Sequence, residues 1–293
     1  MVEVLIEDAK NLCQDALRAL GYSCDELTII SDDLLDAQLQ GYPFAGLART
    51  LSIIETVQSH AKSVARSIKV TRSGPAFAHI NGGDSVGYLV AYEATATAIE
   101  KAKQVGVSLV SANEFFYSGN LSYYAEMAAK EGLITLITSN GSPIVVPYGG
   151  LFAQAVLAQR LGTELPEGVA FDSSGHPTTD PSQVLDGTLA AWGEFKGSGL
   201  AMMVQLLGFA AGSSEPVPFM SNFGFLIIAF DPDILQLRDQ IEQNADRFAE
   251  SIRATNMLPG YAPARLPFER SMDVDSKQKQ EARWMWRRGW FSS

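Results

Sequence analysis

The chain has 293 residues, of which 46% are hydrophobic, and a formal net charge of −11. This length allows one large domain or two ordinary ones, with a core that needs no disulfide bonds. The acidic balance argues against a nucleic-acid partner, and no apolar window reaches the length of a membrane span.

The first sixty residues have the pattern of helices. Apolar residues recur at three- and four-residue steps between Ala9 and Leu20, and Gly21 follows as a helix end. Residues 23–26 (SCDE) fit a capping box for a second helix. Cys13 and Cys24 are best interpreted as small core or near-core residues. Two cysteines and the absence of a basic N-terminal region predict a cytoplasmic protein.

Strands and helices alternate after residue 75. Residues 76–80, 107–110 and 133–137 are predicted as strands, with a turn at 81–84 and helices over 86–104 and 121–130. The segment 143–150 is predicted to be extended and 151–161 helical. Residues 223–230 form the clearest strand pattern, and 233–254 the clearest amphipathic helix.

The interleaving predicts an α/β or mixed α+β fold. Three of the four tryptophans lie in the basic tail 283–291 (RWMWRRGWF). Such a tail can bind lipid or single-stranded nucleic acid, but a terminal helix docked on the core or on a partner subunit is the simpler interpretation.

The residues alone give weak chemical signals. Three scattered histidines make no metal-binding spacing, and we predict no metal site. Lys196 opens a glycine-rich helix start that could bind an anion, or could simply pack closely. Arg49 could clamp a carboxylate, although without further information a surface arginine is the simpler interpretation.

Five stretches, read together, resemble one family. Residues 36–49 (DAQLQGYPFAGLAR) resemble a helix end followed by G-H-D-S-H-G-x-x-R, and 122–133 (SYYAEMAAKEGL) resemble G-Y-Y-A-x-x-A-A-E-x-G-L. Residues 139–150 resemble T-N-x-x-P and then P-x-G-G. Segments 166–181 and 196–200 (KGSGL) follow in family order, and 265–270 (RLPFER) resemble R-L-P-G-x-E/R. The chain is similar to the malate/L-lactate dehydrogenase family of NAD(P)-dependent reductases, which is unrelated to the Rossmann-fold lactate dehydrogenases.

The resemblance implies a non-Rossmann, mixed sheet flanked by helices. Residues 71–232 would form the cofactor-binding domain, and 1–70, completed by 233–293, a helical domain. The family includes sulfolactate, ureidoglycolate and diketogulonate dehydrogenases and piperideine-2-carboxylate reductases. We therefore expect a homodimer, a small carboxylate substrate, and NAD or NADP as cofactor, with NADPH slightly favoured.

The matched positions imply roles for single residues. Arg49 falls at the family's carboxylate clamp, which reverses its simpler interpretation above. Lys196 and Gly197 match a cofactor-binding K-G pair, and Asn140 and Ser142 lie in a loop near the nicotinamide. The resemblance also implies a cofactor contact near the C-terminus, at Phe268 and Glu269. Phe268 stands where the family usually has glycine.

Three departures concern the chemistry. The family's acid/base histidine falls on Ala45, and a second histidine falls on Tyr117. After Gly150 the chain lacks a stretch that carries L-G-T-N-P in members of the family. Either the gene lacks this stretch, or a loop is absent from the sequence between Gly150 and Leu151. Alanine cannot donate a proton, whereas Tyr117 is either the catalytic acid or an aromatic wall residue.

These departures from the family pattern leave two hypotheses for the function. One is a reductase with altered proton delivery that acts on a 2-oxo acid or a cyclic imine-2-carboxylate. The other is a catalytically retired family member that binds a ligand or a partner. Retention of Arg49 and Lys196 favours the reductase.

Overall fold

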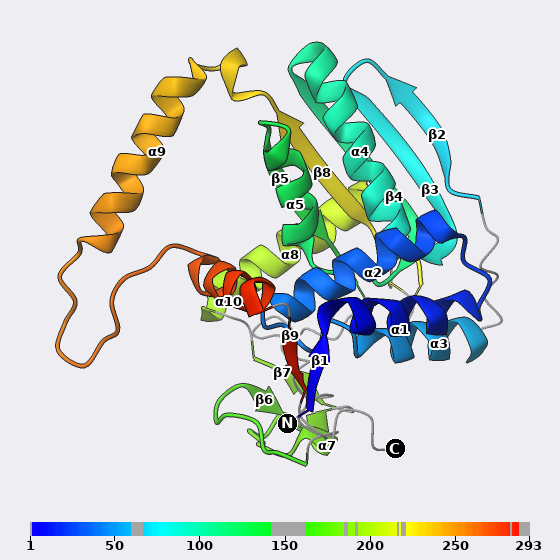
Figure 1. Cartoon of the computed structure of the whole chain (residues 1–293), viewed down its shortest axis with the longest axis vertical. Coiled ribbons are helices and arrows are strands. Elements are labelled where there is room, and N and C mark those ends of the chain that lie inside the picture. Colours follow the sequence, from blue (N-terminus) through cyan, green and yellow to red (C-terminus); the bar gives the residue numbers. More distant parts are fainter. Residues whose placement is uncertain are drawn as a thin grey trace.

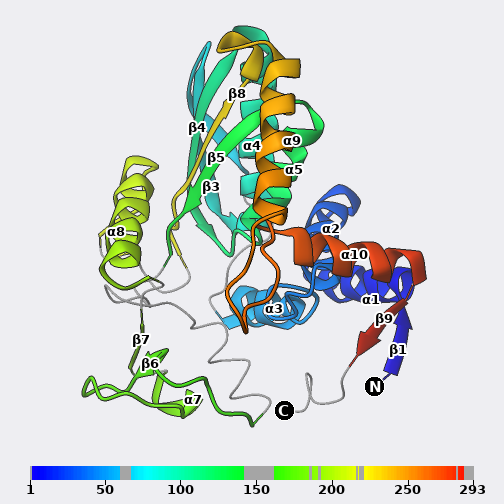
Figure 2. The ribbon, with the colours of Figure 1, turned by 90° about the vertical axis from the view of Figure 1, so that its left-hand side faces the viewer.

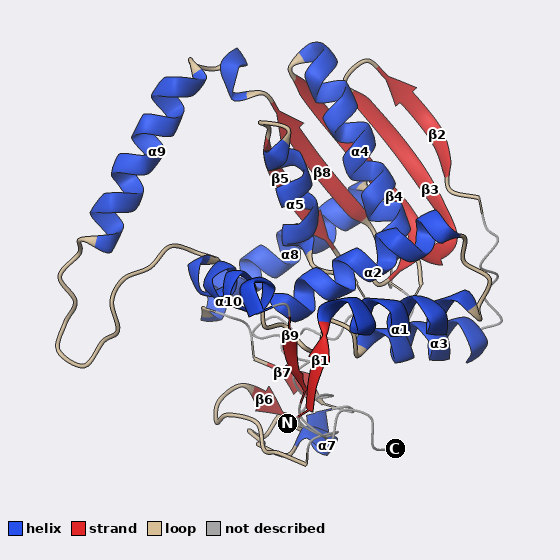
Figure 3. Ribbon diagram, in the orientation of Figure 1, coloured by secondary structure: helices blue, strands red, loops and turns tan. Residues whose placement is uncertain are grey.

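The chain forms a five-stranded mixed sheet with a layer of helices at one end (Figure 1, Figure 3). The computed structural model describes residues 2–59, 67–141, 162–184, 187–190, 193–215, 217, 221–281 and 283–286. The mixed sheet flanked by helices confirms the predicted fold class. The domain boundaries stay a prediction.

The strands of the sheet lie in the order β2-β3-β4-β8-β5. Their bounds are β2 Lys69–Gly74, β3 Phe77–Val86, β4 Val107–Phe116, β5 Ile134–Ser139 and β8 Phe225–Phe230. β3 and β4 are parallel and are joined by helix α4 (Gly87–Val105), whereas the other neighbouring pairs are antiparallel. The parallel pair therefore brings the ends of β3 and β4 to the same edge, next to the helical layer.

One face of the sheet is buried under α4 and α5 (Leu121–Lys130). Side chains alternate along each strand, so that Ile80 and Val110 point into this core while Phe77 and Leu109 point away from it. The face of α4 toward the sheet is lined by small residues, which allow close approach: Ala91, Ala94, Ala98 and Ala102.

The helical layer has a second core. It is built from α1 (Ile6–Arg18), α2 (Cys24–Leu39) and α3 (Arg49–Ser59). α2 begins at the predicted capping box, in which the Ser23 hydroxyl accepts from the Glu26 amide and the Glu26 carboxylate accepts from the Ser23 amide. α10 (Glu269–Glu281) packs against α2, and the hydroxyl of Ser271 on α10 lies 2.7 Å from that of Tyr42, just after α2.

Two helices extend from the sheet. α8 (Glu194–Ala210) lies on the side opposite α4 and α5 (Figure 2). α9 (Arg238–Arg253) follows the short helix η1 (Pro232–Ile234) and stands away from the body, with no buried residue (Figure 1). The remaining elements are the small unit β6 (Ala170–Phe171), α7 (Pro181–Val184) and β7 (Thr188–Leu189), and the strand pair β1 (Val2–Leu5) and β9 (Arg283–Trp286).

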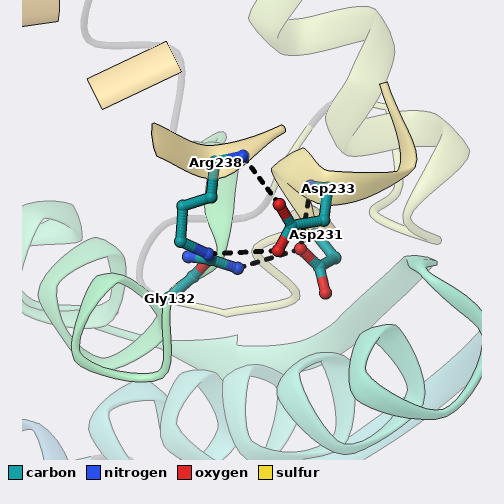
Figure 4. Close-up of polar contacts among 4 residues, drawn as sticks. All are labelled: Gly132, Asp231, Asp233 and Arg238. Atoms are coloured by element: carbon teal, nitrogen blue, oxygen red, sulfur yellow. Dashed lines mark hydrogen bonds and ion pairs between the residues drawn. The ribbon is translucent and has the colours of Figure 1, made fainter. Parts of the chain in front are cut away.

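The base of α9 is fixed by Arg238 (Figure 4). Its guanidinium donates to the Gly132 carbonyl at 2.7 Å and pairs with Asp231 at 3.0 Å and Asp233 at 3.2 Å. The amide of Arg238 also donates to Asp233, at 2.7 Å. The bond to Gly132 ties the start of α9 to the turn before β5, and the three bonds to Asp231 and Asp233 tie it to the segment at η1. Together they set the direction in which α9 leaves the sheet.

Several local predictions are wrong. The sequence predicts residues 283–286 as part of a terminal helix, but they form strand β9. This strand pairs with β1 at the other end of the chain. The predicted turn 81–84 is an irregularity within β3, where Gly83 and Asp84 have φ of 59° and 62°. The helix predicted from residue 233 begins at Arg238, after η1. The predictions for 143–150 and 151–161 lie outside the described residues.

Within the described part of the chain, no helix has both the length and the apolarity to cross a membrane. The same residues contain no cluster of three or more potential metal ligands.

Candidate functional site

The turn between α2 and α3 forms the first wall of the site. The Leu47 amide donates to the Gln38 side-chain oxygen at 3.3 Å, and the Arg49 amide donates to the Gly46 carbonyl at 2.8 Å. A Cβ on Gly46 would lie 2.6 Å from that same oxygen of Gln38, so glycine permits the close packing. α3 consequently begins at Arg49, with Ala45 one turn before it.

The loop after β4 forms the second wall. Tyr117 has φ of 53°, in the left-handed region that non-glycine residues rarely adopt, and Gly119 has φ of 75°. The Tyr124 hydroxyl, from α5, donates to the Ser118 carbonyl at 2.8 Å. A left-handed tyrosine costs about 1–3 kcal/mol and persists where its surroundings hold it. This loop is therefore held by the elements behind it.

The end of β5 forms the third wall. The Asn140 side-chain oxygen accepts from the Gly224 amide at 2.6 Å, and its nitrogen donates to the Ser213 hydroxyl at 2.8 Å. The side chain of Asn140 is buried and joins β5 to the segments around α8 and β8. Its amide group is thus used within the protein, although Asn140 lies at the wall of the site.

The three walls line a pocket of about 380 Å³ that is open to solvent. The guanidinium carbon of Arg49 lies 4.8 Å from the centroid of the Tyr117 ring. Ala45 and Asn140 also line the pocket, which therefore unites four positions that the sequence analysis singled out. The other lining side chains include apolar and hydroxyl groups, among them Phe44, Leu121, Phe223, Ser118 and Ser139.

Two buried ionisable groups at the pocket have strongly shifted pKa values: Tyr88, which lines it, and Asp33, which lies behind it. Burial raises the pKa of Tyr88, Asp33 raises it further, and Arg49 lowers it. Burial also raises the pKa of Asp33 to about 8. The pocket is consequently backed by groups that stay neutral at pH 7, with the Arg49 guanidinium as the charged group at its wall.

The remaining predicted residues lie elsewhere. Lys196 is exposed and Gly197 half-buried in the first turns of α8, and neither is among the described residues that line the Arg49 pocket. Phe268 is 56% exposed with φ of 69°. Ser142 lies outside the described residues. The cofactor roles of all of these residues stay predictions.

Glu269 has structural partners at the start of α10. Its carboxylate accepts from the Leu266 amide at 2.7 Å and from the Arg253 guanidinium at 2.7 Å. The amide of Leu266 first, and then Arg253, lower the pKa of Glu269. Glu269 thus caps α10 and joins it to the end of α9.

The sequence analysis missed Asp33, Tyr88 and the two serines of the pocket. Asp33 had a detectable signal, because it lies three residues after Ile30 and four before Ala37, on the buried face of α2. An acidic residue on an apolar helix face marks a special site. Ser118, Ser139 and Tyr88 had no comparable signal, because the pocket joins segments distant in sequence.

Comparison with protein families gives one match over most of the chain. The model of the family described as malate/L-lactate dehydrogenase matches residues 4–155 and 152–283. The two matched segments meet at residues 152–155, close to the position where the resemblance predicts a missing stretch.

Three known proteins illustrate the similarity. The malate/(S)-sulfolactate dehydrogenase of Methanothermus fervidus is 29% identical over 297 residues, covering 87% of each chain. The structure of sulfolactate dehydrogenase from Methanocaldococcus jannaschii has a TM-score of 0.87 and 25% identity, covering 99% of this chain and 94% of that one. The structure of delta1-piperideine-2-carboxylate reductase from Pseudomonas syringae has a TM-score of 0.81 at 21% identity, covering 96% and 95%, and shows the shared fold.

The family match spans the whole five-stranded sheet and all three walls of the pocket. The chain belongs to the malate/L-lactate dehydrogenase family and is an oxidoreductase of that type.

Proposed function

We propose that the protein is an NAD(P)H-dependent reductase of a small 2-oxo acid or cyclic imine-2-carboxylate. The observation that supports this most strongly is Arg49, whose guanidinium lies at the wall of an open pocket of about 380 Å³. A guanidinium binds a carboxylate through two parallel hydrogen bonds, which fixes the orientation of the acid as well as its charge.

The Tyr117 ring holds the guanidinium in place. A guanidinium within about 6 Å of an aromatic centroid is attracted to the face of the ring. The ring limits the motion of the Arg49 side chain, so that less entropy is lost when a carboxylate binds. Arg49 and Tyr117 together therefore orient the substrate acid group.

The pocket fits the reacting ends of substrate and cofactor. When bound, a nicotinamide supplies a hydride to the carbon next to the carboxylate. The apolar side chains of Phe44, Leu121 and Phe223 suit a flat ring, and the pocket volume suits such a ring together with a small acid. The phosphates would lie outside the pocket, where Lys196 at the start of α8 is a candidate partner. We propose NADPH over NADH by a small margin.

Proton delivery differs between the two substrate classes. Reduction of a ketone leaves an alkoxide that must take up a proton, and Ala45 cannot provide one. The Tyr117 phenol is the proposed donor at this pocket. A protonated iminium accepts the hydride alone, and the product nitrogen keeps its proton, so the loss of the family histidine affects imine reduction less.

Steady-state rates test the proposal. Oxidation of NADPH and NADH is followed with pyruvate-like 2-oxo acids and with cyclic imine-2-carboxylates. Turnover of either class supports the reductase, and faster turnover of the imines supports the altered proton delivery. Faster turnover of the ketones would refute the preference for imines.

A second candidate function follows from Ala45 and Tyr117, which replace both family histidines. The protein could be a retired member that binds a ligand or a partner without turnover. Titration with NADPH, followed by nucleotide fluorescence and by tryptophan quenching, distinguishes the two. If neither NADPH nor NADH binds, the hypothesis of a family member without catalytic activity is favoured over the reductase.

We also propose that the protein is a homodimer. The sheet face opposite α4 and α5 carries two apolar rows across paired strands. The first row is Phe77, Leu109, Ile228 and Leu136, and the second is Val107, Phe230 and Ile134. Leu109 and Leu136 are 46% and 52% exposed, and exposed apolar rows of this extent are typical of protein interfaces.

The helix arms supply matching surfaces. α9 has an apolar stripe, and its Phe248 is 64% exposed. α8 exposes further large apolar side chains, among them Phe195, Leu200, Met203 and Leu206. A second copy of the chain would cover these surfaces, because each copy offers both a sheet face that α8 covers only in part and an amphipathic helix with no buried residue.

A further inference from the structure

A buried acid lies directly behind the pocket loop. Asp33 on α2 is 1% exposed, and among the described residues neither of its oxygens receives a hydrogen bond of ordinary geometry. A buried carboxylate without such partners is strongly disfavoured relative to the protonated acid. Burial raises the pKa of Asp33 to about 8, Asp36 raises it further, and the Tyr124 hydroxyl and Asn120 amide oppose the shift. Asp33 is therefore largely a neutral acid at pH 7.

The Tyr124 hydroxyl lies between Asp33 and the pocket loop. It donates its single proton to the Ser118 carbonyl at 2.8 Å. Its opposing effect on the pKa of Asp33 is smaller than the effect of burial. Tyr124 therefore connects the surroundings of Asp33 to the backbone of Ser118.

Gly119 connects Asp33 to the pocket. A Cβ on Gly119 would lie 2.6 Å from an oxygen of Asp33 and 2.6 Å from a ring carbon of Tyr88. Asp33 and Tyr88 therefore pack directly against the backbone of Gly119, which lines the pocket. The same loop carries Tyr117 in its left-handed conformation.

We propose that Asp33 is a positioning residue: in its protonated form it supports, through Tyr124 and Gly119, the loop at residues 117–120 that presents Tyr117 and Ser118 to the pocket. Removal of this proton places a charge behind the loop and loosens it. The catalytic part of this inference rests on the proposed reductase function, whereas the structural part does not.

The groups around Asp33 do not offer a compensating charge. Asp36 faces it from α2, Tyr88 from α4, and Tyr123 and Tyr124 from α5. All four are acidic or neutral. Arg49 acts on Tyr88, but among the described residues no cation contributes to the pKa of Asp33. Ionisation of Asp33 is therefore not offset nearby.

Three variants of the full chain test the proposal. Asp33→Asn keeps the shape and a donor toward Tyr124 but cannot ionise. Asp33→Leu removes the donor. Asp32→Asn is the matched control, because Asp32 is the preceding residue on α2, partly exposed and paired with Lys10 at 2.6 Å. Denaturant unfolding at fixed protein concentration is measured from pH 5 to 9, together with kcat/KM on the best substrate.

The expected results test the structural role of Asp33 independently of the proposed reductase function. The stability of the wild type and of Asp32→Asn falls toward alkaline pH more steeply than that of Asp33→Asn. In the wild type kcat/KM declines above pH 8, Asp33→Asn removes this decline, and Asp33→Leu lowers kcat/KM at least tenfold at every pH. Equal pH dependence of stability in the wild type and Asp33→Asn would overturn the proposal, whether or not any substrate is turned over. If Asp33→Leu fails to fold, Asp33→Asn against Asp32→Asn still decides it.

Discussion

The guanidinium carbon of Arg49 lies 4.8 Å from the centre of the Tyr117 ring, although 68 positions separate the two residues in sequence. Arg49 begins α3 in the helical layer, and Tyr117 follows β4 of the sheet. Their contact defines the pocket as a junction between the two cores of the molecule. Substrate recognition and proton delivery are thus proposed for two side chains that touch.

The hydroxyl of Tyr117 can be removed without removing its ring. In Tyr117→Phe the ring still supports Arg49, but no phenol proton is available. We expect kcat on 2-oxo acids to fall about 100-fold, the low end of what a general acid contributes, and kcat on cyclic imines to change less than about threefold. Initial rates with both substrate classes measure this. Equal losses for the two classes would contradict the role of the phenol as proton donor.

For Asn140 we predict a loss of stability and not a loss of cofactor binding. Because its amide group binds the Gly224 amide and the Ser213 hydroxyl, Asn140→Ala leaves a buried donor without its partner. We expect a loss of about 1–3 kcal/mol in the free energy of unfolding, measured by urea denaturation. KM for the nicotinamide cofactor should change little. A large rise in that KM with unchanged stability would instead support the cofactor contact implied by the resemblance.

Asp33 predicts an uncommon pH dependence of stability. Its folded pKa of about 8 lies above the ordinary value of 3.8, so the folded state binds more protons than the unfolded state between these values. Stability from this group is complete below about pH 4 and is lost as pH rises toward 8, with a limiting slope of about 1.4 kcal/mol per pH unit. The urea midpoint of the wild type should therefore fall with rising pH relative to that of Asp33→Asn over that window. A constant difference would be inconsistent with a buried neutral acid.

The exposed apolar rows of the sheet predict the effect of a charge on that face. Leu109→Glu places a carboxylate in the middle of the first apolar row, where Phe77 and Ile228 flank it on the neighbouring strands. Sedimentation velocity should show the wild type as a dimer and Leu109→Glu as a monomer. Arg72→Glu, on the exposed edge strand β2, is the control and should stay dimeric. A monomeric wild type would refute the homodimer.

Much of the secondary structure was predictable because its signals are local. The capping box at Ser23 and the helix over 121–130 depend on neighbouring residues, and both match the structure. The β1–β9 pair was not predictable, because strands at opposite ends of the chain meet. The same holds for the irregular turn in β3, which is compatible with the strand only because β4 pairs on either side of it.

The site was predictable in part. The resemblance singled out Ala45, Arg49, Tyr117 and Asn140, and all four line one pocket. Single-residue roles were harder to predict, because the use of the Asn140 amide within the protein depends on Gly224, far along the chain. The position of Asp33 on the buried face of α2 was detectable, but its link to the pocket depends on Gly119 and Tyr124, which only the fold brings behind the loop.

The most direct test of the central claim compares two substrates in two proteins. NADPH oxidation is measured with a cyclic imine-2-carboxylate and with the same imine lacking the carboxylate, using wild type and Arg49→Leu. Arg72→Gln controls for the loss of a positive charge. The account predicts that the wild type prefers the acid at least 100-fold in kcat/KM, about 2.7 kcal/mol, and that Arg49→Leu abolishes this preference. A preference that persists in Arg49→Leu would contradict the proposed grip of Arg49 on the substrate acid.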